Sequence, residues 1–151
     1  MDPVFRKLAL KGQPLLYILD APESFSSAVA SLTGLAELRT SLARAKDLTW
    51  VLQFALTRKQ VDAFATRIAK AATGDATVWV AYPKGTSRKY KADFNRDHGW
   101  EKMGEAGFEP VSQVSIDEDW SALRFRRVEH IPTMTRSFAI TAAGKRKTGR
   151  A

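Results

Sequence analysis

A nearly unbroken apolar run from Thr77 to Tyr82 constrains the fold more than any other part of this sequence. The run reads Thr-Val-Trp-Val-Ala-Tyr, and β-branched and aromatic residues dominate it. A strand with one solvated face alternates polar and apolar residues, whereas this pattern is typical of a strand buried on both faces. Pro83 ends the strand because it has no N–H to donate. The run therefore predicts a central strand of a parallel sheet with helices on both sides.

Other strands and helices alternate with this central strand. Two more buried strands are expected over 14–20 and 48–56, and helices are expected after 22, from 57 to about 73, and from about 96 to 106. Thr57 and Gln60 have the spacing of a capping box at the start of the second helix, and Gly74-Asp75 is expected to stop it. Alternating strands and helices predict an α/β three-layer sandwich with a mostly parallel sheet of about five to six strands.

A hairpin is expected to close the sheet. The segments 111–116 and 120–128 read as strands, and the acidic segment 117–119 between them reads as a turn. Strands joined so tightly are antiparallel, so the last strand is expected to lie antiparallel between the third core strand and the edge. Residues 35–46 leave two alternatives open, a helix or a short edge strand through 36–39.

The length of 151 residues predicts one domain, which we place at 14–128. Residues 1–13 are expected to be a mobile lead-in. Residues 129–140 are too apolar for a free tail and are expected to pack on the domain or on another molecule. Residues 141–151 are basic and rich in Gly, Thr and Ala, and are expected to be disordered.

Composition excludes several classes of site. The chain has no cysteine, so it has neither disulfides nor thiolate metal ligands, and it has no apolar run near the roughly 20 residues that span a bilayer. We therefore expect a cytoplasmic protein without a membrane partner. The net charge of +8 makes nucleic acid a candidate partner, through the basic loop after Pro83 and the basic tail.

Four motifs carry a resemblance to known proteins. They are Leu-Asp-Ala-Pro-Glu-Ser-Phe at 19–25, Trp-Val-Ala-Tyr-Pro-Lys at 79–84, Asn-Arg-Asp at 95–97, and Ile-Asp-Glu-Asp-Trp-Ser-Ala-Leu-Arg-Phe at 116–125. The chain resembles a small bacterial family of unknown function whose members look like a reduced class I S-adenosylmethionine-dependent methyltransferase with a Rossmann-like core. The order of elements from 48 to 128 is similar to the C-terminal half of those enzymes.

The resemblance implies S-adenosylmethionine as cofactor, but two features depart from the family pattern. The family has a glycine-rich loop after the first strand, where the missing Cβ lets the backbone approach the cofactor. Here that loop is 20–24, and it contains no glycine. An acidic residue that would hold the ribose is expected at the end of the second strand, and Glu37 is the one candidate. The sequence therefore disfavours this cofactor.

Candidate ligand-binding residues gather where the predicted strands end. Ligands of open α/β sheets bind at the carboxyl ends of the strands, and a basic loop follows the central strand. Its cations would contact phosphate, and Tyr90 or Phe94 would stack on a ligand. The same loop also fits a solvated surface loop with Phe94 in the core. The candidate residues are Asp20, Tyr82, Lys84, Thr86, Ser87, Arg88, Lys89, Asp93 and Arg124.

Some of these residues also have structural interpretations. Asp93 or Asn95 could cap the third helix. Arg124 and Arg126 share one face of the last strand, where Arg126 is expected to reach solvent and Arg124 needs a partner or a ligand. Neither His98 nor His130 has metal-ligand spacing, and no nucleophile elbow is present, so no metal or catalytic residue is assigned.

Three functions follow from this sequence. The first is a non-catalytic or vestigial methyltransferase-like domain that binds a small anionic ligand or a partner at the carboxyl ends of its strands. The second is an active S-adenosylmethionine-dependent methyltransferase with an atypical cofactor loop. The third is a nucleic-acid-associated basic protein.

Overall fold

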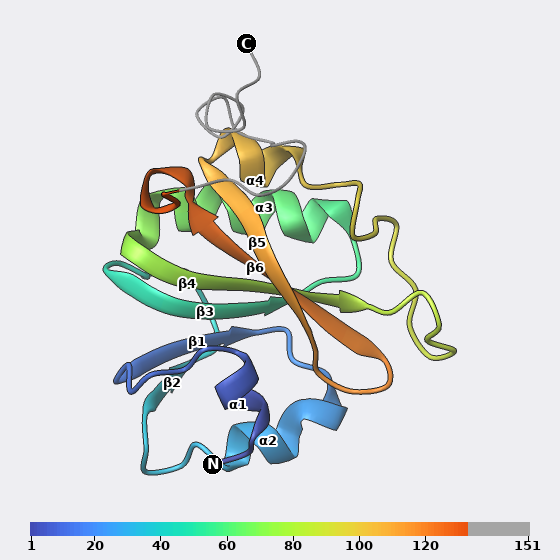
Figure 1. Cartoon of the computed structure of the whole chain (residues 1–151). Coiled ribbons are helices and arrows are strands. Elements are labelled where there is room, and N and C mark those ends of the chain that lie inside the picture. The colour runs from blue at the N-terminus through green and yellow to red at the C-terminus, as the bar shows by residue number, and fades with distance from the viewer. Residues whose placement is uncertain (133–151) are drawn as a thin grey trace.

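The computed structural model describes residues 1–132 and contains one six-stranded sheet in the order β2-β1-β3-β4-β6-β5 (Figure 1). The strands β2, β1, β3 and β4 are parallel to one another, and β6 is antiparallel to both β4 and β5. The predicted position of the last strand is therefore confirmed. The strands are β1 (Leu15–Leu19), β2 (Glu37–Arg39), β3 (Leu48–Phe54), β4 (Ala72–Pro83), β5 (Phe108–Ser115) and β6 (Trp120–Arg127).

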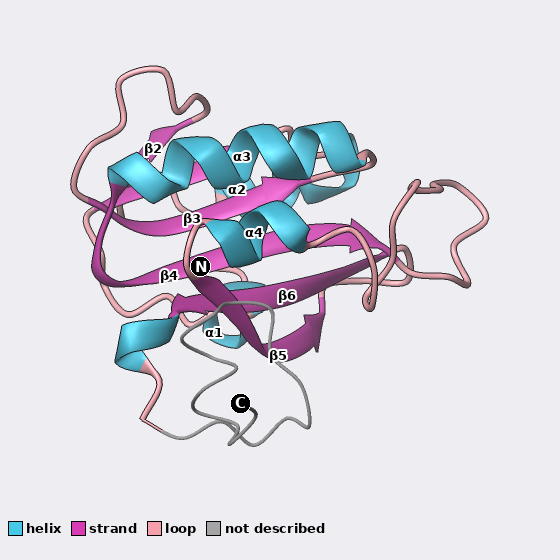
Figure 2. Cartoon of the chain, turned by 90° about the horizontal axis from the view of Figure 1, so that it is seen from above, coloured by secondary structure: helices cyan, strands magenta, loops and turns pink. Residues whose placement is uncertain are grey.

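Helices cover both faces of the sheet, which confirms the predicted three-layer α/β sandwich. Figures 1 and 2 show α3 and α4 over one face, and α1 and α2 over the other. None of the described helices is long and apolar enough to cross a bilayer. The helices are α1 (Val4–Lys7), α2 (Ser26–Ala30), α3 (Arg58–Ala71) and α4 (Glu101–Glu105), with short 3₁₀ turns at Glu23–Phe25 and Val128–His130.

The central strand β4 contributes to the core on each face. Val78, Val80 and Tyr82 pack in the core under α3 and α4, whereas Trp79 and Ala81 pack in the core under α1 and α2. Because successive side chains of a strand point to opposite faces, a strand buried on both sides must be apolar at each position. This packing explains the apolar run that the sequence shows.

The helix α3 begins where the sequence predicts. The Thr57 hydroxyl accepts the Gln60 N–H at 3.1 Å, and the Gln60 side chain accepts the Thr57 N–H at 3.2 Å. The predicted stop at Gly74-Asp75 is wrong, because α3 ends at Ala71 and both residues lie inside β4. Arg127 donates to the carbonyls of the last helical turn and of the first strand residue, so the end is stabilised by a residue distant in sequence.

The N-terminal segment, where a mobile lead-in was expected over 1–13, packs on the sheet through α1. Phe5 and Leu8 are completely buried against the sheet. The Leu8 carbonyl accepts the indole N–H of Trp50 at 3.0 Å and that of Trp79 at 2.7 Å. The short helix α1 therefore closes the core on its face by satisfying two buried donors. The predicted extension 129–140 is described only to 132, where Ile131 is buried, and the predicted tail 141–151 lies outside the described residues.

Two other segments differ in detail from the sequence prediction. Residues 35–46 contain the short edge strand β2 and no helix, which settles the alternative left open. The helix expected from 96 begins only at Glu101, because Gly99 has a φ of +105° that a helix cannot contain. Neither proposed cap is used. Asp93 instead accepts the N–H of Arg58 at 2.7 Å, at the start of α3, and Asn95 accepts from two amides of its own turn.

Candidate ligand-binding site

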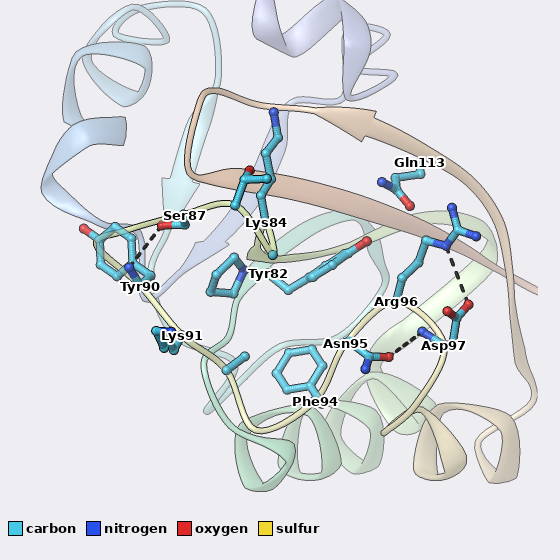
Figure 3. A pocket seen from close by; sticks show the side chains of 14 residues that line it. Tyr82, Lys84, Ser87, Tyr90, Lys91, Phe94, Asn95, Arg96, Asp97 and Gln113 are labelled. Carbon is cyan, nitrogen blue, oxygen red and sulfur yellow. Dashed lines mark hydrogen bonds and ion pairs between the residues drawn. The ribbon is translucent and has the colours of Figure 1, made fainter.

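A cavity of about 620 Å³ lies at the carboxyl end of β4 (Figure 3). Its walls come from the last residues of β4, from the loop that follows, and from one residue of β5. The lining side chains and backbone belong to Tyr82, Pro83, Lys84, Gly85, Thr86, Ser87, Tyr90, Lys91, Ala92, Phe94, Asn95, Arg96, Asp97 and Gln113.

Ser87 gives the loop its shape. Its hydroxyl donates to the Asp119 carboxylate at 2.8 Å and accepts the N–H groups of Lys89 and Tyr90 at 3.2 and 3.1 Å. The Lys84 N–H also donates to the Asp119 carbonyl at 2.8 Å. The loop is therefore attached to the turn between β5 and β6, and Ser87 acts as a structural residue although it lines the cavity.

The cations around the cavity differ in how firmly they are held. The Lys84 ammonium donates to the hydroxyl of Ser115, a neutral partner on β5, at 2.6 Å. Arg96 lies 3.6 Å from Asp97, and both side chains are 65% exposed. Lys91 has no ion pair with any described residue. Because exposed pairs contribute little, these charges remain available to an anion.

Two residues that line the cavity have backbone donors without a partner among the described residues. The amides of Gly85 and Thr86 donate to no acceptor within residues 1–132. Unpaired amides in a turn form a concavity that binds anions, since the N–H dipoles converge on it. Thr86 adds a hydroxyl that can donate or accept.

Tyr82 forms the floor of the cavity. Its ring packs against Phe94 at 6.2 Å and Trp100 at 6.0 Å between centroids. Burial raises the pKa of the Tyr82 phenol, an effect that Arg96 opposes and Asp97 reinforces. Phe94 is buried in this cluster, which agrees with the interpretation that it belongs to the core, and a stacking role for it remains a prediction. The phenol remains a neutral hydrogen-bond donor at physiological pH.

The structure brings together four of the nine predicted site residues, Tyr82, Lys84, Thr86 and Ser87. Arg88 and Lys89 lie on the loop but outside the cavity, and the Lys89 ammonium lies over the Tyr90 ring at 5.5 Å. Asp93 accepts the N–H of Arg58 at the start of α3. Asp20 and Arg124 lie elsewhere on the sheet.

Gln113 is the lining residue that comes from outside β4 and its loop, and the sequence did not indicate it. It pairs with Leu123 of β6, which pairs with Val80 of β4, so it faces the same side of the sheet as Tyr82. Only the strand register reveals this, because β4 and β5 are not adjacent in the sheet.

Arg124 lies opposite Trp79, on the face covered by α1. Its Nε atom is buried and has no hydrogen-bond partner among the described residues, and burial lowers the pKa of its guanidinium. Arg126 was predicted to reach solvent, but its side chain forms an ion pair instead. It binds the Asp75 carboxylate with two hydrogen bonds of 3.0 and 2.7 Å. Neither arginine lines the cavity at the carboxyl end of β4.

A second region lies at the carboxyl end of β1. The chain crosses from β2 on one side of β1 to β3 on the other, so ligands of this fold class bind beside β1. Two hollows of about 240 and 430 Å³ meet there and share Asp20 and Thr40. The Gln53 amide donates to the Asp20 carboxylate at 2.9 Å, across the gap between β1 and β3.

The residues of this second region do not fit S-adenosylmethionine. Asp20 adopts a φ of +57° in the loop that contains no glycine, so a residue with a side chain stands at the strand end where the family pattern has its glycine-rich loop. Glu37 cannot hold a ribose, because it lies at the amino end of β2, opposite Leu15, and pairs with Arg39 at 2.6 Å. The carboxyl end of β2 carries Arg39 and Thr40 instead of an acid.

Comparisons with solved structures identify the fold. The chain is similar to an S-adenosylmethionine-dependent methyltransferase from Aquifex aeolicus, with a TM-score of 0.57 and 12% identity over 82% of this chain and 87% of that chain. For a putative type 11 methyltransferase from Sulfolobus solfataricus, the TM-score is 0.50 and the identity is 9%, over 82% of this chain and 77% of that chain. For the pre-rRNA processing protein fibrillarin from Methanococcus jannaschii, the TM-score is 0.51 and the identity is 12%, over 83% of this chain and 76% of that chain. The fold of the chain is therefore methyltransferase-like.

The sequence matches no protein-family model and no curated protein. At these identities, the similarity to solved structures establishes the Rossmann-like architecture and leaves the chemistry to be argued from the residues.

Proposed function

We propose that this chain is a non-catalytic methyltransferase-like domain that binds a small anionic ligand in the cavity at the carboxyl end of β4. One observation carries the proposal. Three cations, Lys84, Lys91 and Arg96, line this cavity, and the single acid among the lining residues is Asp97. An excess of positive charge in a hollow raises the local concentration of anions.

The donors around the cavity suit an oxyanion such as phosphate. The free amides of Gly85 and Thr86 supply fixed dipoles, and the lysines supply charge. Phosphate accepts several hydrogen bonds at once, and charge-assisted hydrogen bonds are the strongest of these contacts. The ligand would thus be held by the loop without any nucleophile or metal.

The absence of a fitting cofactor region supports the non-catalytic part of the proposal. Asp20 lies where the family backbone approaches its cofactor, and Glu37 lies at the wrong end of β2. An active methyltransferase with an atypical loop is the alternative, and it requires that this region still bind the cofactor.

Calorimetric titration of the full chain with inorganic pyrophosphate and, separately, with S-adenosylhomocysteine tests the proposal. We expect heat with pyrophosphate and none with S-adenosylhomocysteine. Replacing Lys91 or Arg96 by alanine should weaken pyrophosphate binding about tenfold, since each removes a charge-assisted contact. Lys70→Ala, which removes an equal charge from the exposed end of α3, should leave it unchanged.

Two results would contradict the proposal. Absence of pyrophosphate binding would remove the anion site. A dissociation constant of about micromolar for S-adenosylhomocysteine, or roughly −8 kcal/mol, would instead restore the methyltransferase alternative.

A nucleic-acid role is a second candidate, favoured by the exposed cations Arg88 and Lys89 outside the cavity. Affinity for single-stranded RNA should then fall steeply with salt, and the double substitution of these two residues by alanine should reduce the slope. Unchanged RNA affinity in this variant would exclude the loop as the contact.

A further inference from the structure

Tyr82, Arg96 and Gln113 form one corner of the cavity, and they come from three different elements. Tyr82 is the second-last residue of β4, Arg96 belongs to the loop, and Gln113 belongs to β5. Figure 3 shows the Tyr82 hydroxyl directed toward the space between the other two side chains. This corner therefore presents a phenol, a guanidinium and a carboxamide to one place.

We infer that this corner binds the phosphate of a phosphorylated sugar, whose hydroxyl groups face the rest of the cavity. The inference rests on the proposed function and names the class of its ligand. Sugar phosphates and nucleotides share this chemistry.

All three groups of the corner can donate to an anion. The Tyr82 phenol stays protonated because burial raises its pKa. Arg96 is held only by a long contact of 3.6 Å to an exposed carboxylate, so its other N–H groups are open. The Gln113 amide is exposed and makes no hydrogen bond with a described residue.

The arrangement favours a tetrahedral anion over a planar one. A carboxylate offers two oxygens in one plane and is matched by a single arginine fork. A phosphomonoester offers three terminal oxygens in different directions. Donors that reach one place from β4, from β5 and from the loop suit the second geometry.

The size of the cavity requires more than a phosphate. A volume of about 620 Å³ lies in the range of roughly 300–1,000 Å³ that holds whole small molecules. Away from the corner, the walls offer the Thr86 hydroxyl, the Gly85 and Thr86 amides, and the ammonium of Lys91. Pro83 and Ala92 add apolar surface between them. A sugar fits such walls because it carries a rim of hydroxyls around apolar C–H faces.

Calorimetry of the full chain with inorganic phosphate, ribose 5-phosphate and adenosine monophosphate tests the inference. We expect ribose 5-phosphate to bind about tenfold more tightly than phosphate, because its hydroxyls add hydrogen bonds. Tyr82→Phe and Gln113→Leu should each weaken it several-fold, and thermal unfolding should show that both variants remain folded. Ser112→Ala, on the opposite face of β5, is the matched control.

The outcomes separate this inference from the proposed function. Phosphate binding without any gain for ribose 5-phosphate would overturn the sugar and leave the anion site intact. Unchanged affinities in Tyr82→Phe and Gln113→Leu would overturn the corner. Absence of binding by phosphate and by pyrophosphate would remove both proposals. Tighter binding of adenosine monophosphate than of ribose 5-phosphate supports a nucleotide, and equal or weaker binding supports a sugar phosphate.

Discussion

Asp75 and Arg126 form the ion pair with the best geometry in the described chain. Both nitrogens of the guanidinium fork reach the carboxylate, and the same arginine donates to the His130 carbonyl at 2.9 Å. The hydrogen bond from Arg126 is the main reason that the pKa of Asp75 is lowered, while partial burial opposes it. The pair joins the amino end of β4 to the carboxyl end of β6.

We predict that this pair makes stability depend on acid pH. A carboxylate whose pKa is lower when folded stabilises the protein above its unfolded pKa of about 3.9, and this contribution is lost as pH falls through the folded pKa. Asp75→Asn should therefore reduce the free energy of unfolding at pH 7 by up to about 1 kcal/mol, because the pair is partly exposed and screened. The free energy of unfolding of this variant should also fall less steeply below pH 4, because the variant has no carboxylate at position 75 to protonate.

Urea unfolding at pH 7 and at about pH 3 measures both effects. Glu118→Gln removes an exposed carboxylate that has no ion pair among the described residues, and it serves as the control. Equal pH profiles for Asp75→Asn and the unsubstituted protein would show that the pair does not contribute.

The start of α3 shows how a short sequence pattern places a whole element. Thr57 and Gln60 satisfy each other's backbone donors, and Asp93 satisfies the N–H of Arg58 next to them. The first pair is local and was predictable from four residues. Asp93 comes from the loop that lines the cavity, so the helix start and the loop are joined.

We predict that Thr57→Ala lowers the free energy of unfolding by about 1 kcal/mol, because the Gln60 N–H loses its acceptor. Thr66→Ala, at an exposed position inside the same helix, should have little effect or stabilise slightly, since alanine is the better helix former. Denaturant titration followed by circular dichroism compares the two. Equal losses in both variants would contradict a specific role for the cap.

The whole molecule is built around one sheet with a core on each face. Phe5 from α1 and Phe64 from α3 are buried in different cores, but the strands between them belong to both. Because the strands are shared, loss of one core should expose the other, and the domain should unfold as one unit.

We predict that Phe5→Ala lowers the free energy of unfolding by about 3–5 kcal/mol, through loss of buried area and the cavity left behind. Trp50, Trp79 and Trp120 lie in the core of the α1 face and Trp100 lies in the other core, so tryptophan fluorescence is weighted toward the α1 face. Circular dichroism is weighted toward α3, the longest described helix, on the other face. The unfolding midpoints followed by the two signals should shift by the same amount in Phe5→Ala. Arg6→Ala, at an exposed position, should shift neither midpoint. A shift of fluorescence alone would show that the faces unfold separately.

Sequence reasoning recovered the site in part. Tyr82 and Lys84 follow from their place at the end of a predicted central strand, and the charge of the loop was visible as a run of cations. Gln113 was not predicted, because its closeness to Tyr82 depends on the pairing of β6 with both neighbours. A ligand-binding role for Ser87 remains a prediction. In the structure its hydroxyl donates to the Asp119 carboxylate.

Elements and their order could be derived from sequence because their signals are local. Apolar period, proline, glycine and capping residues act within a few positions, so β4, the start of α3 and the closing hairpin were predictable. Tertiary structure decided which distant residues meet. Arg127 donates to a carbonyl at the end of α3, and the Leu8 carbonyl accepts two indole N–H groups. Asp93 accepts an N–H at the start of α3 instead of capping α4. These contacts depend on strand register and on helix placement across the sheet, which no stretch of neighbouring residues specifies.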